Sequence, residues 1–381
     1  MKHYIFKAIA ILFILTITFP PFIIGVSVRA GMVLVASLFL FPKLLTKGSF
    51  IALLVYTFEM FLYYLLGNRY FESVNSVISP FAVIGSSIIL TEYIIQYDKE
   101  NSFSRLSILV IIIVDLLMSL ISIPILNNDP NIIRNIYSEG MRGVGRSLLY
   151  MFIISWGTIS SLPFLFAPMV NICKKTYKTK KSTFLFWFIS IIILFFIIFR
   201  SNITTPFIVS IIMIIIGCII GFERFTKKNI VKTIFLGFFA ISLTSPVIVI
   251  PVLNFFQENM VGGDTSGKLD EIKDAVVYGD VDGDLGSRND LFNQSLSLFF
   301  DSPFTGTSNP EKIGQHSFFI DRLACHGVLF IIPLIILFVV MIRRIYRNLT
   351  HSKVIYVFAT GSFLFMLLFK SDAYMEIWLS R

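Results

Sequence analysis

Charged residues are scarce in this chain: Asp, Glu, Lys and Arg make up only 14% of its 381 residues. Water-soluble domains usually carry about a quarter charged residues. Hydrophobic residues account for 56% of the chain, and 41 residues are phenylalanine. They stand in apolar runs far longer than a β-strand. The composition therefore excludes a water-soluble core and predicts an integral membrane protein.

Cysteine is also rare, with only Cys173, Cys218 and Cys325 in the chain. Their odd number and wide spacing provide neither a disulfide framework nor a zinc site. Acidic residues are outnumbered, and the formal net charge is +9. The basic residues nevertheless lie in short clusters between apolar runs, where cytoplasmic loops carry them, and this distribution excludes a nucleic-acid partner.

Apolar stretches follow one another along the whole chain, and a helix needs about 20 such residues to cross a membrane. We therefore expect an all-α polytopic membrane protein with about eleven transmembrane helices (about 10–12), forming one membrane domain over residues 1–381. The first stretch is too long for a signal-peptide core, so we expect it to remain as a span. The predicted spans are 5–26, 30–46, 49–66, 74–97, 105–126, 147–172, 184–200, 203–222, 230–256, 326–342 and 354–370.

Basic residues predict the orientation of these spans. With the N-terminus in the cytoplasm, every dense cluster of Lys and Arg falls on the inner face, including those at 174–181 and 343–353. Residues 257–325, between spans nine and ten, then form one large loop on the outer face. This loop holds 12 of the 23 acidic residues and only five Lys or Arg. The two faces thus carry opposite charge signatures.

A transporter is one interpretation of such a chain. Transporters commonly combine paired halves with polar residues in mid-span. No internal repeat is evident here, and the only acids well inside the predicted spans are Glu59, Glu92 and Asp115. Polar residues are concentrated in the outer loop instead, which favours chemistry at a membrane surface over passage through a channel.

The first half of the outer loop is rich in Gly and Asp. The spacing of Asp280, Asp282 and Asp284 resembles the start of a calcium loop. The sixth position is Leu285 instead of Gly, however, and the twelfth is Leu291 instead of Glu. The EF-hand pattern therefore fails, and we expect a solvated acidic turn.

The second half of the loop begins at Arg288 with a short amphipathic helix that ends near Asp301. It is too short to span the membrane and suits the membrane interface or the roof of a site. Of the four histidines, His316 lies in this loop close to a helix start, and His326 lies where span ten begins. A neutral imidazole is a natural general base near pH 7, and His316 is the preferred candidate.

Several arginines fall on the outer side, against the usual insertion bias. As a set they could line a pocket for an anion, because the arginine fork binds phosphate oxygens at two points. Arg200 carries the most weight, since it lies in a short polar break before Thr204 and Pro206, which open the next helix. The outward arginines are Arg134, Arg142, Arg146, Arg200 and Arg288.

The ordered motifs of this region resemble the O-antigen polymerase and O-antigen ligase superfamily. The resemblance covers Phe199 to Ile332 at motif level, and the large outer loop agrees with it. Two positions depart from the family pattern: Phe199 replaces the Ser before Arg200, and Ser317 replaces the common Asn. The motif residues are Arg200-Ser201, Arg288, Ser302-Pro303-Phe304, Gly306, His316-Ser317-Phe318-Phe319 and Gly327.

The resemblance implies a GT-C-like bundle that acts on undecaprenyl-diphosphate-linked oligosaccharides at the outer face of the bacterial cytoplasmic membrane. Arg200 and Arg288 would bind the diphosphate, and His316 would deprotonate the acceptor hydroxyl. Arg142 and Arg146 would be weaker contacts. No metal or other cofactor is required, and the implied partners are the lipid-linked glycan, membrane lipid and a chain-length regulator.

A polysaccharide polymerase is the preferred interpretation. The alternatives are a ligase that transfers the finished glycan to lipid A core, and a polysaccharide flippase or transporter. Motifs do not separate polymerase from ligase, because acceptor recognition lies in the variable loops.

Overall fold

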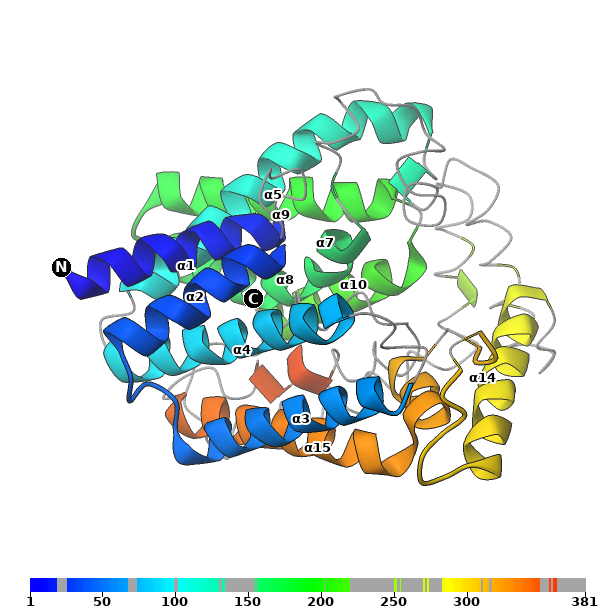
Figure 1. Ribbon diagram of the computed structural model, residues 1–381. Coiled ribbons are helices and arrows are strands. Elements are labelled where there is room, and N and C mark those ends of the chain that lie inside the picture. Colours follow the sequence, from blue (N-terminus) through cyan, green and yellow to red (C-terminus); the bar gives the residue numbers. More distant parts are fainter. Residues whose placement is uncertain are drawn as a thin grey trace.

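The fold is seen in a computed structural model. It describes residues 1–18, 26–67, 74–98, 102–129, 156–201, 203–219, 283–309, 311–314 and 317–349, with a few short pieces between and after them. In this described part every regular element is a helix (Figure 1). The helices are α1 Lys2–Thr18, α2 Val26–Leu40, α3 Lys47–Leu65, α4 Val74–Tyr97, α5 Ser102–Asn128, α7 Trp156–Ser161, α8 Pro163–Thr176, α9 Lys181–Arg200, α10 Thr204–Ile219, α14 Gly283–Asp301 and α15 Phe318–Asn348.

Four of the described helices are long and apolar enough to cross a membrane: α3, α5, α9 and α15. Two shorter apolar helical segments cover Ala30–Leu40 and Thr205–Ile219. The described part of the chain is thus all-helical and contains helices suited to span a membrane, in agreement with the composition. The full count of about eleven stays a prediction, since the spans expected at 230–256 and 354–370 lie wholly or largely outside the described residues.

The surface of α9 illustrates how these helices are built. Its buried side chains recur every three or four residues, as at Ser190, Leu194 and Ile197, while Ile192 and Phe196 on the other face are exposed. Both faces are apolar, so the pattern is that of a helix with one stripe against protein and the rest against lipid.

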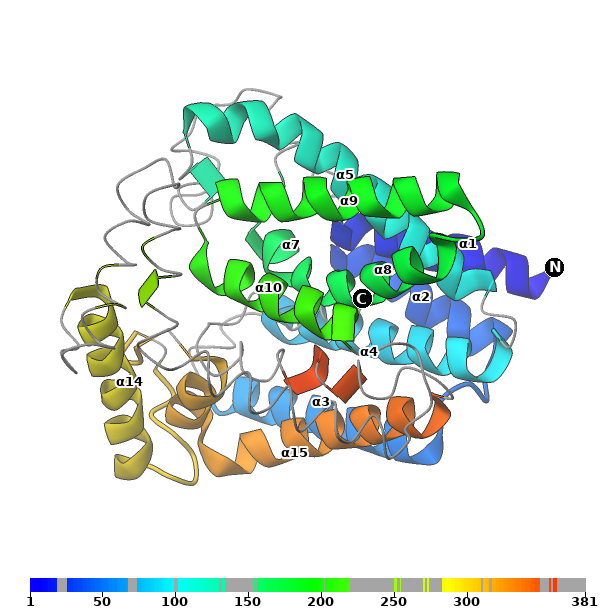
Figure 2. The ribbon, with the colours of Figure 1, turned by 180° about the vertical axis from the view of Figure 1, so that it is seen from behind.

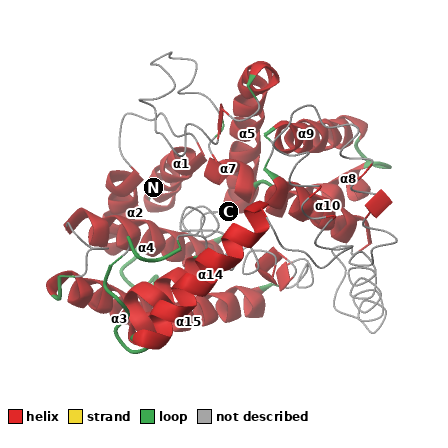
Figure 3. Cartoon of the chain, turned by 90° about the vertical axis from the view of Figure 1, so that its right-hand side faces the viewer, coloured by secondary structure: helices red, strands yellow, loops and turns green. Residues whose placement is uncertain are grey.

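The spans run side by side, and α14 crosses their end (Figures 1 and 2). α3 packs along α15, α2 along α4, and α8 against both α9 and α10. α14 packs against α15 and, viewed from that end, lies across the bundle (Figure 3). A helix with this placement suits the membrane interface expected for the amphipathic segment.

Several predicted boundaries were wrong. The single span expected at 147–172 is divided in its described part into α7 and α8, which begins at Pro163, because proline lacks the backbone donor that would continue a helix. α15 begins eight residues before the predicted start at 326, and α14 begins at Gly283, five residues before Arg288. The predicted end of α14 at Asp301 is confirmed.

Candidate functional site

Helix α15 is broken at Gly327, near the end where α14 lies. Gly327 has φ 72° and ψ −177°, which interrupts the regular helix. In an unbroken helix, Val328 and Leu329 would donate to the carbonyls of Ala324 and Cys325. Here their N–H groups donate instead to Pro303 O at 2.9 Å and Phe304 O at 3.4 Å.

The carbonyls freed by the break accept hydrogen bonds from the same loop. Thr307 N donates to Ala324 O at 2.8 Å, and Ser308 N donates to Cys325 O at 2.9 Å. Four backbone bonds to residues 303–308 thus replace two bonds within the helix. Irregular backbone near a membrane is tolerated where its polar groups are satisfied by protein in this way.

Two glycines make this docking possible. Gly306 and Gly327 both have φ near +70°, at 69° and 72°, a conformation that favours glycine. A Cβ at Gly306 would lie 2.3 Å from the carbonyl carbon of Cys325, and one at Gly327 would lie 2.2 Å from the carbonyl oxygen of Phe304. Without a side chain, Gly306 leaves room for the backbone of Cys325, and Gly327 leaves room for the backbone of Phe304.

A buried polar network connects α14 to the start of α15. Ser295 Oγ on α14 donates to Asp321 Oδ1 at 2.7 Å and accepts from Gly314 N at 2.8 Å. Asp321 Oδ2 accepts from Ser317 N at 2.7 Å. Ser317 also caps α15, because its Oγ accepts from Ile320 N at 3.3 Å. Buried polar groups need such partners, and this network supplies them between two helices.

His326 lies at the break and is fully buried, with 0% of its surface exposed. Tyr63 on α3 donates its hydroxyl to the His326 carbonyl, and Phe330 packs with its ring centroid 4.5 Å from the imidazole. Nε2 of His326 lies 3.2 Å from Nη1 of Arg322. A guanidinium can only donate, so this imidazole nitrogen is the acceptor.

Arg200 ends α9, and α10 begins at Thr204, as the polar break between them predicted. The Arg200 Nε donates to Oδ1 of Asn127, in the last turn of α5, at 2.8 Å, and Nη2 donates to the same oxygen. Among the described residues, this uncharged amide is the partner that contacts Arg200, and it leaves Nη1 and one N–H of Nη2 for other acceptors. Arg200 thus offers donors suited to an oxyanion.

The other predicted site residues are described only in part. Arg288 lies in α14, with its backbone but not its side chain described. Arg142, Arg146 and His316 lie outside the described residues, as does Arg134. Arg200 contacts α5, whereas α14, the helix that carries Arg288, packs against α15. A shared pocket for Arg200 and Arg288 stays a prediction.

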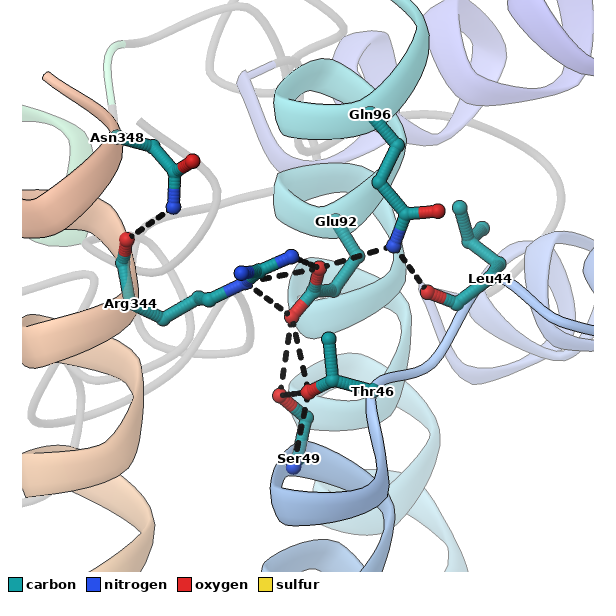
Figure 4. Close-up of polar contacts among 7 residues, drawn as sticks. All are labelled: Leu44, Thr46, Ser49, Glu92, Gln96, Arg344 and Asn348. Carbon is teal, nitrogen blue, oxygen red and sulfur yellow. Dashed lines mark hydrogen bonds and ion pairs between the residues drawn. The ribbon is translucent and has the colours of Figure 1, made fainter.

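A second polar cluster joins the C-terminal ends of α4 and α15, away from the break at Gly327 (Figure 4). Arg344 makes a two-point ion pair with Glu92, with Nε 3.1 Å from Oε1 and Nη2 3.0 Å from Oε2. Ser49 Oγ and Gln96 Nε2 also donate to this carboxylate, at 3.0 and 3.2 Å. Glu92 is fully buried. This buried acid therefore has hydrogen-bond donors on both carboxylate oxygens and joins α4 to α15.

Sequence reasoning missed Asn127 and Ser295, the pairing of Ser295 with Asp321, and the pairing of Glu92 with Arg344. The N-cap role of Ser317 could have been predicted from the sequence, because a Ser directly before an apolar run is a common N-cap. The other contacts join residues 26 to 252 positions apart, and no local pattern in the chain indicates them.

Comparison with known proteins gives no match to this chain, whether with family models, curated proteins or solved structures.

Proposed function

We propose that this chain is a membrane glycosyltransferase of the O-antigen polymerase type, with a GT-C-like bundle. It joins undecaprenyl-diphosphate-linked oligosaccharide units into a polysaccharide at the outer face of the bacterial cytoplasmic membrane. The N-terminus lies in the cytoplasm, and the reaction takes place beneath the loop 257–325.

One observation carries the proposal. Two of the motifs on which the family resemblance depends, Ser302-Pro303-Phe304 with Gly306 and the later Gly327, are about 20 positions apart in the sequence and meet at the break in α15. Pro303 and Phe304 accept hydrogen bonds from the residues that follow Gly327, and Gly306 faces Cys325 too closely for a side chain. Ser317 acts as an N-cap, a role that Ser and the family's common Asn fill about equally well. The motif residues Pro303, Phe304, Gly306 and Gly327 therefore form one structural unit, which supports the proposed relationship.

In the proposed reaction, the acceptor sugar hydroxyl attacks the anomeric carbon of the donor sugar. His316 takes the hydroxyl proton as the new glycosidic bond forms. The bond to undecaprenyl diphosphate breaks, its electron pair leaves with the diphosphate, and the anomeric centre is inverted. Arg200 and Arg288 offset the negative charge of the leaving group, a task that does not require a metal ion. Arg142 and Arg146 are weaker contacts to the diphosphate or the glycan.

The surroundings of Arg200 support its role. A charged guanidinium held by a neutral amide retains its attraction for an anion, whereas a carboxylate partner would compete with the substrate. The Glu92–Arg344 pair agrees with the proposed order of the spans, because it joins helix ends that the positive-inside rule assigns to one and the same face.

The test is polymer formation by the purified protein in lipid nanodiscs with a synthetic undecaprenyl-diphosphate-linked oligosaccharide. Wild type should give a ladder of glycan lengths. Arg200→Ala and Arg288→Ala should abolish it, because each loses charge-assisted bonds of ~1.5–3 kcal/mol. Lys replacements should restore only part of the rate. Arg134→Ala is the control and should leave the ladder nearly unchanged.

His316→Ala should lower the rate ~10²–10⁴-fold. His3→Ala, at the opposite end of the bundle, is its control. In cells, loss of polymer with single repeat units still attached to lipid or core would identify a polymerase. A ligase variant would leave the core without any repeat unit. Wild-type ladders from both arginine variants and from His316→Ala would refute the proposed site.

A further inference from the structure

We propose that Asp321 and Ser295 are a positioning pair: they hold the backbone of Gly314 and Ser317 to α14, and these two residues enclose the proposed base His316 in the sequence. The inference rests on the proposed function, because it assigns these residues a task in the same reaction. Neither residue needs to touch the substrate.

The network bonds the backbone at Gly314 and at Ser317. Gly314 donates its backbone N–H to Ser295, and Ser317 donates its backbone N–H to Asp321. The two acceptors are joined to each other by the bond from Ser295 Oγ to Asp321 Oδ1 at 2.7 Å. Only Gln315 and His316 separate the two anchored amides in the sequence. One connected polar unit therefore anchors the chain two residues before and one residue after His316 in the sequence.

A helix cap alone does not account for this arrangement. Capping α15 requires only the Ser317 hydroxyl, and the reciprocal bond from Ser317 N to Asp321 completes that cap. Ser295 belongs to another helix, α14, and its hydroxyl bonds both to Asp321 and to the backbone N–H of Gly314. The additional bonds therefore fix the backbone of Gly314 and Ser317 relative to α14, the helix that carries Arg288.

The packing around the network leaves little room for adjustment. Ser295, Ser317 and Asp321 are 0%, 2% and 8% exposed. A Cβ at Gly314 would lie 2.2 Å from the backbone oxygen of Leu291 on α14. Buried and fully hydrogen-bonded polar groups rigidify their surroundings, which is what a general base needs to stay within hydrogen-bond reach of its proton.

The experiment compares Asp321→Asn, Asp321→Ala and Ser295→Ala in the nanodisc assay, with membrane abundance and unfolding temperature measured for each protein. We expect kcat to fall about 10- to 100-fold in the alanine variants, the cost of a misplaced catalytic group, while the donor KM changes by less than about threefold. Asp321→Asn should lie between wild type and Asp321→Ala, because an amide has one acceptor oxygen for the two bonds. Asp301→Asn and Ser297→Ala, at exposed positions on α14, are the matched controls and should keep wild-type kcat.

Hydrogen exchange provides a second readout that does not depend on turnover. The backbone amides of Gly314 and Ser317 should exchange faster in Ser295→Ala and Asp321→Ala than in wild type. If wild type is active and the alanine variants keep its kcat, the positioning role is refuted while the proposed function stands. If kcat per folded molecule is unchanged and only the unfolding temperature falls, the network is purely structural. If wild type makes no polymer, the proposed function fails, and this role fails with it.

Discussion

At the scale of single residues, the surroundings of His326 decide whether this histidine can act as the base. His326 is buried, and its Nε2 faces the Arg322 guanidinium. Protonating that nitrogen would place two cations in contact within an apolar bundle, so His326 is poorly suited to act as a general base. It instead contributes packing and a backbone acceptor for Tyr63. This leaves His316 as the proposed base.

Asp98 is a residue whose charge stabilises a helix directly. It lies just before α5, and its carboxylate accepts from the backbone N–H groups of Phe103 at 2.9 Å and Ser104 at 2.8 Å. The Ser104 hydroxyl donates to it as well, at 2.6 Å. Burial by itself would raise the pKa of Asp98, but these hydrogen bonds lower it overall below the usual value. The charged form is therefore favoured in the folded protein.

We expect this carboxylate to stabilise the protein above the pKa of an unfolded Asp, near ~4, and to lose its effect as the pH falls through the lower folded pKa. Asp98→Asn should cost about 1 kcal/mol at neutral pH, the usual value of a helix cap. The difference between wild type and variant should shrink as the pH falls below ~4.

The measurement is the thermal unfolding midpoint in detergent from pH 7 to pH 3. Asp290→Asn, at an exposed site on α14, should follow wild type throughout. A wild-type to Asp98→Asn difference that stays constant over this range would show that the charge of Asp98 does not stabilise α5.

At the scale of elements, the break in α15 depends on two glycines. Gly327→Ala and Gly306→Ala each place a side chain in left-handed backbone, at a cost of about 1–2 kcal/mol. Each added Cβ also meets backbone atoms of the opposite segment at 2.2–2.3 Å. We therefore expect both variants to release the loop 303–308, lower the unfolding temperature and abolish the proposed activity.

Gly31→Ala in α2 is the control for these glycines, since nothing lies within 4 Å of its added Cβ. It should stabilise the helix by up to ~1 kcal/mol. Wild-type stability and hydrogen exchange in Gly306→Ala and Gly327→Ala would show that the docked loop does not need either glycine.

The Glu92–Arg344 pair holds α4 to α15, and its two partners differ in exposure. The Glu92 side chain is 0% exposed and the Arg344 side chain is 32% exposed. Arg344→Met leaves the buried Glu92 carboxylate without its cation, whereas in Glu92→Met the Arg344 side chain can extend toward water. We expect Arg344→Met to cost about 2–4 kcal/mol and Glu92→Met to cost less.

The double variant Glu92→Met/Arg344→Met should recover much of the loss, because replacing a buried ion pair with apolar side chains is often nearly neutral. Arg343→Met, at an exposed neighbouring site, should change stability by less than ~0.5 kcal/mol. Unfolding in detergent gives the stability of wild type and of the four variants. Additive losses in the double variant would contradict a direct coupling of the two residues.

At the scale of the whole molecule, the charge distribution predicts how the bundle sits in the membrane. Residues 174–181 and 343–353 should face the cytoplasm, and residues near 270 should face outward. In a background without native cysteines, Asp270→Cys should react with an impermeant thiol reagent in intact cells. Lys178→Cys should react only after the membrane is opened. Labelling of Lys178→Cys in intact cells would overturn the orientation.

The sequence by itself determined the membrane character of the chain, its helical class, and local boundaries such as the polar break at Arg200 and the end of α14 at Asp301. These features depend on hydropathy over a window and on the short-range preferences of Pro, Gly and capping residues, which act within a few residues of their own position.

Only the tertiary structure decided which helices meet and which polar groups pair. In water, an apolar stripe shows which face of a helix is buried. In lipid, the same apolar side chains suit both the bilayer and a neighbouring helix, so α9 carries no such signal. The contacts of Arg200 with Asn127, of Ser295 with Asp321 and of Glu92 with Arg344 therefore follow from close packing. Packing brings distant donors and acceptors together where leaving a polar group unpaired would be costly.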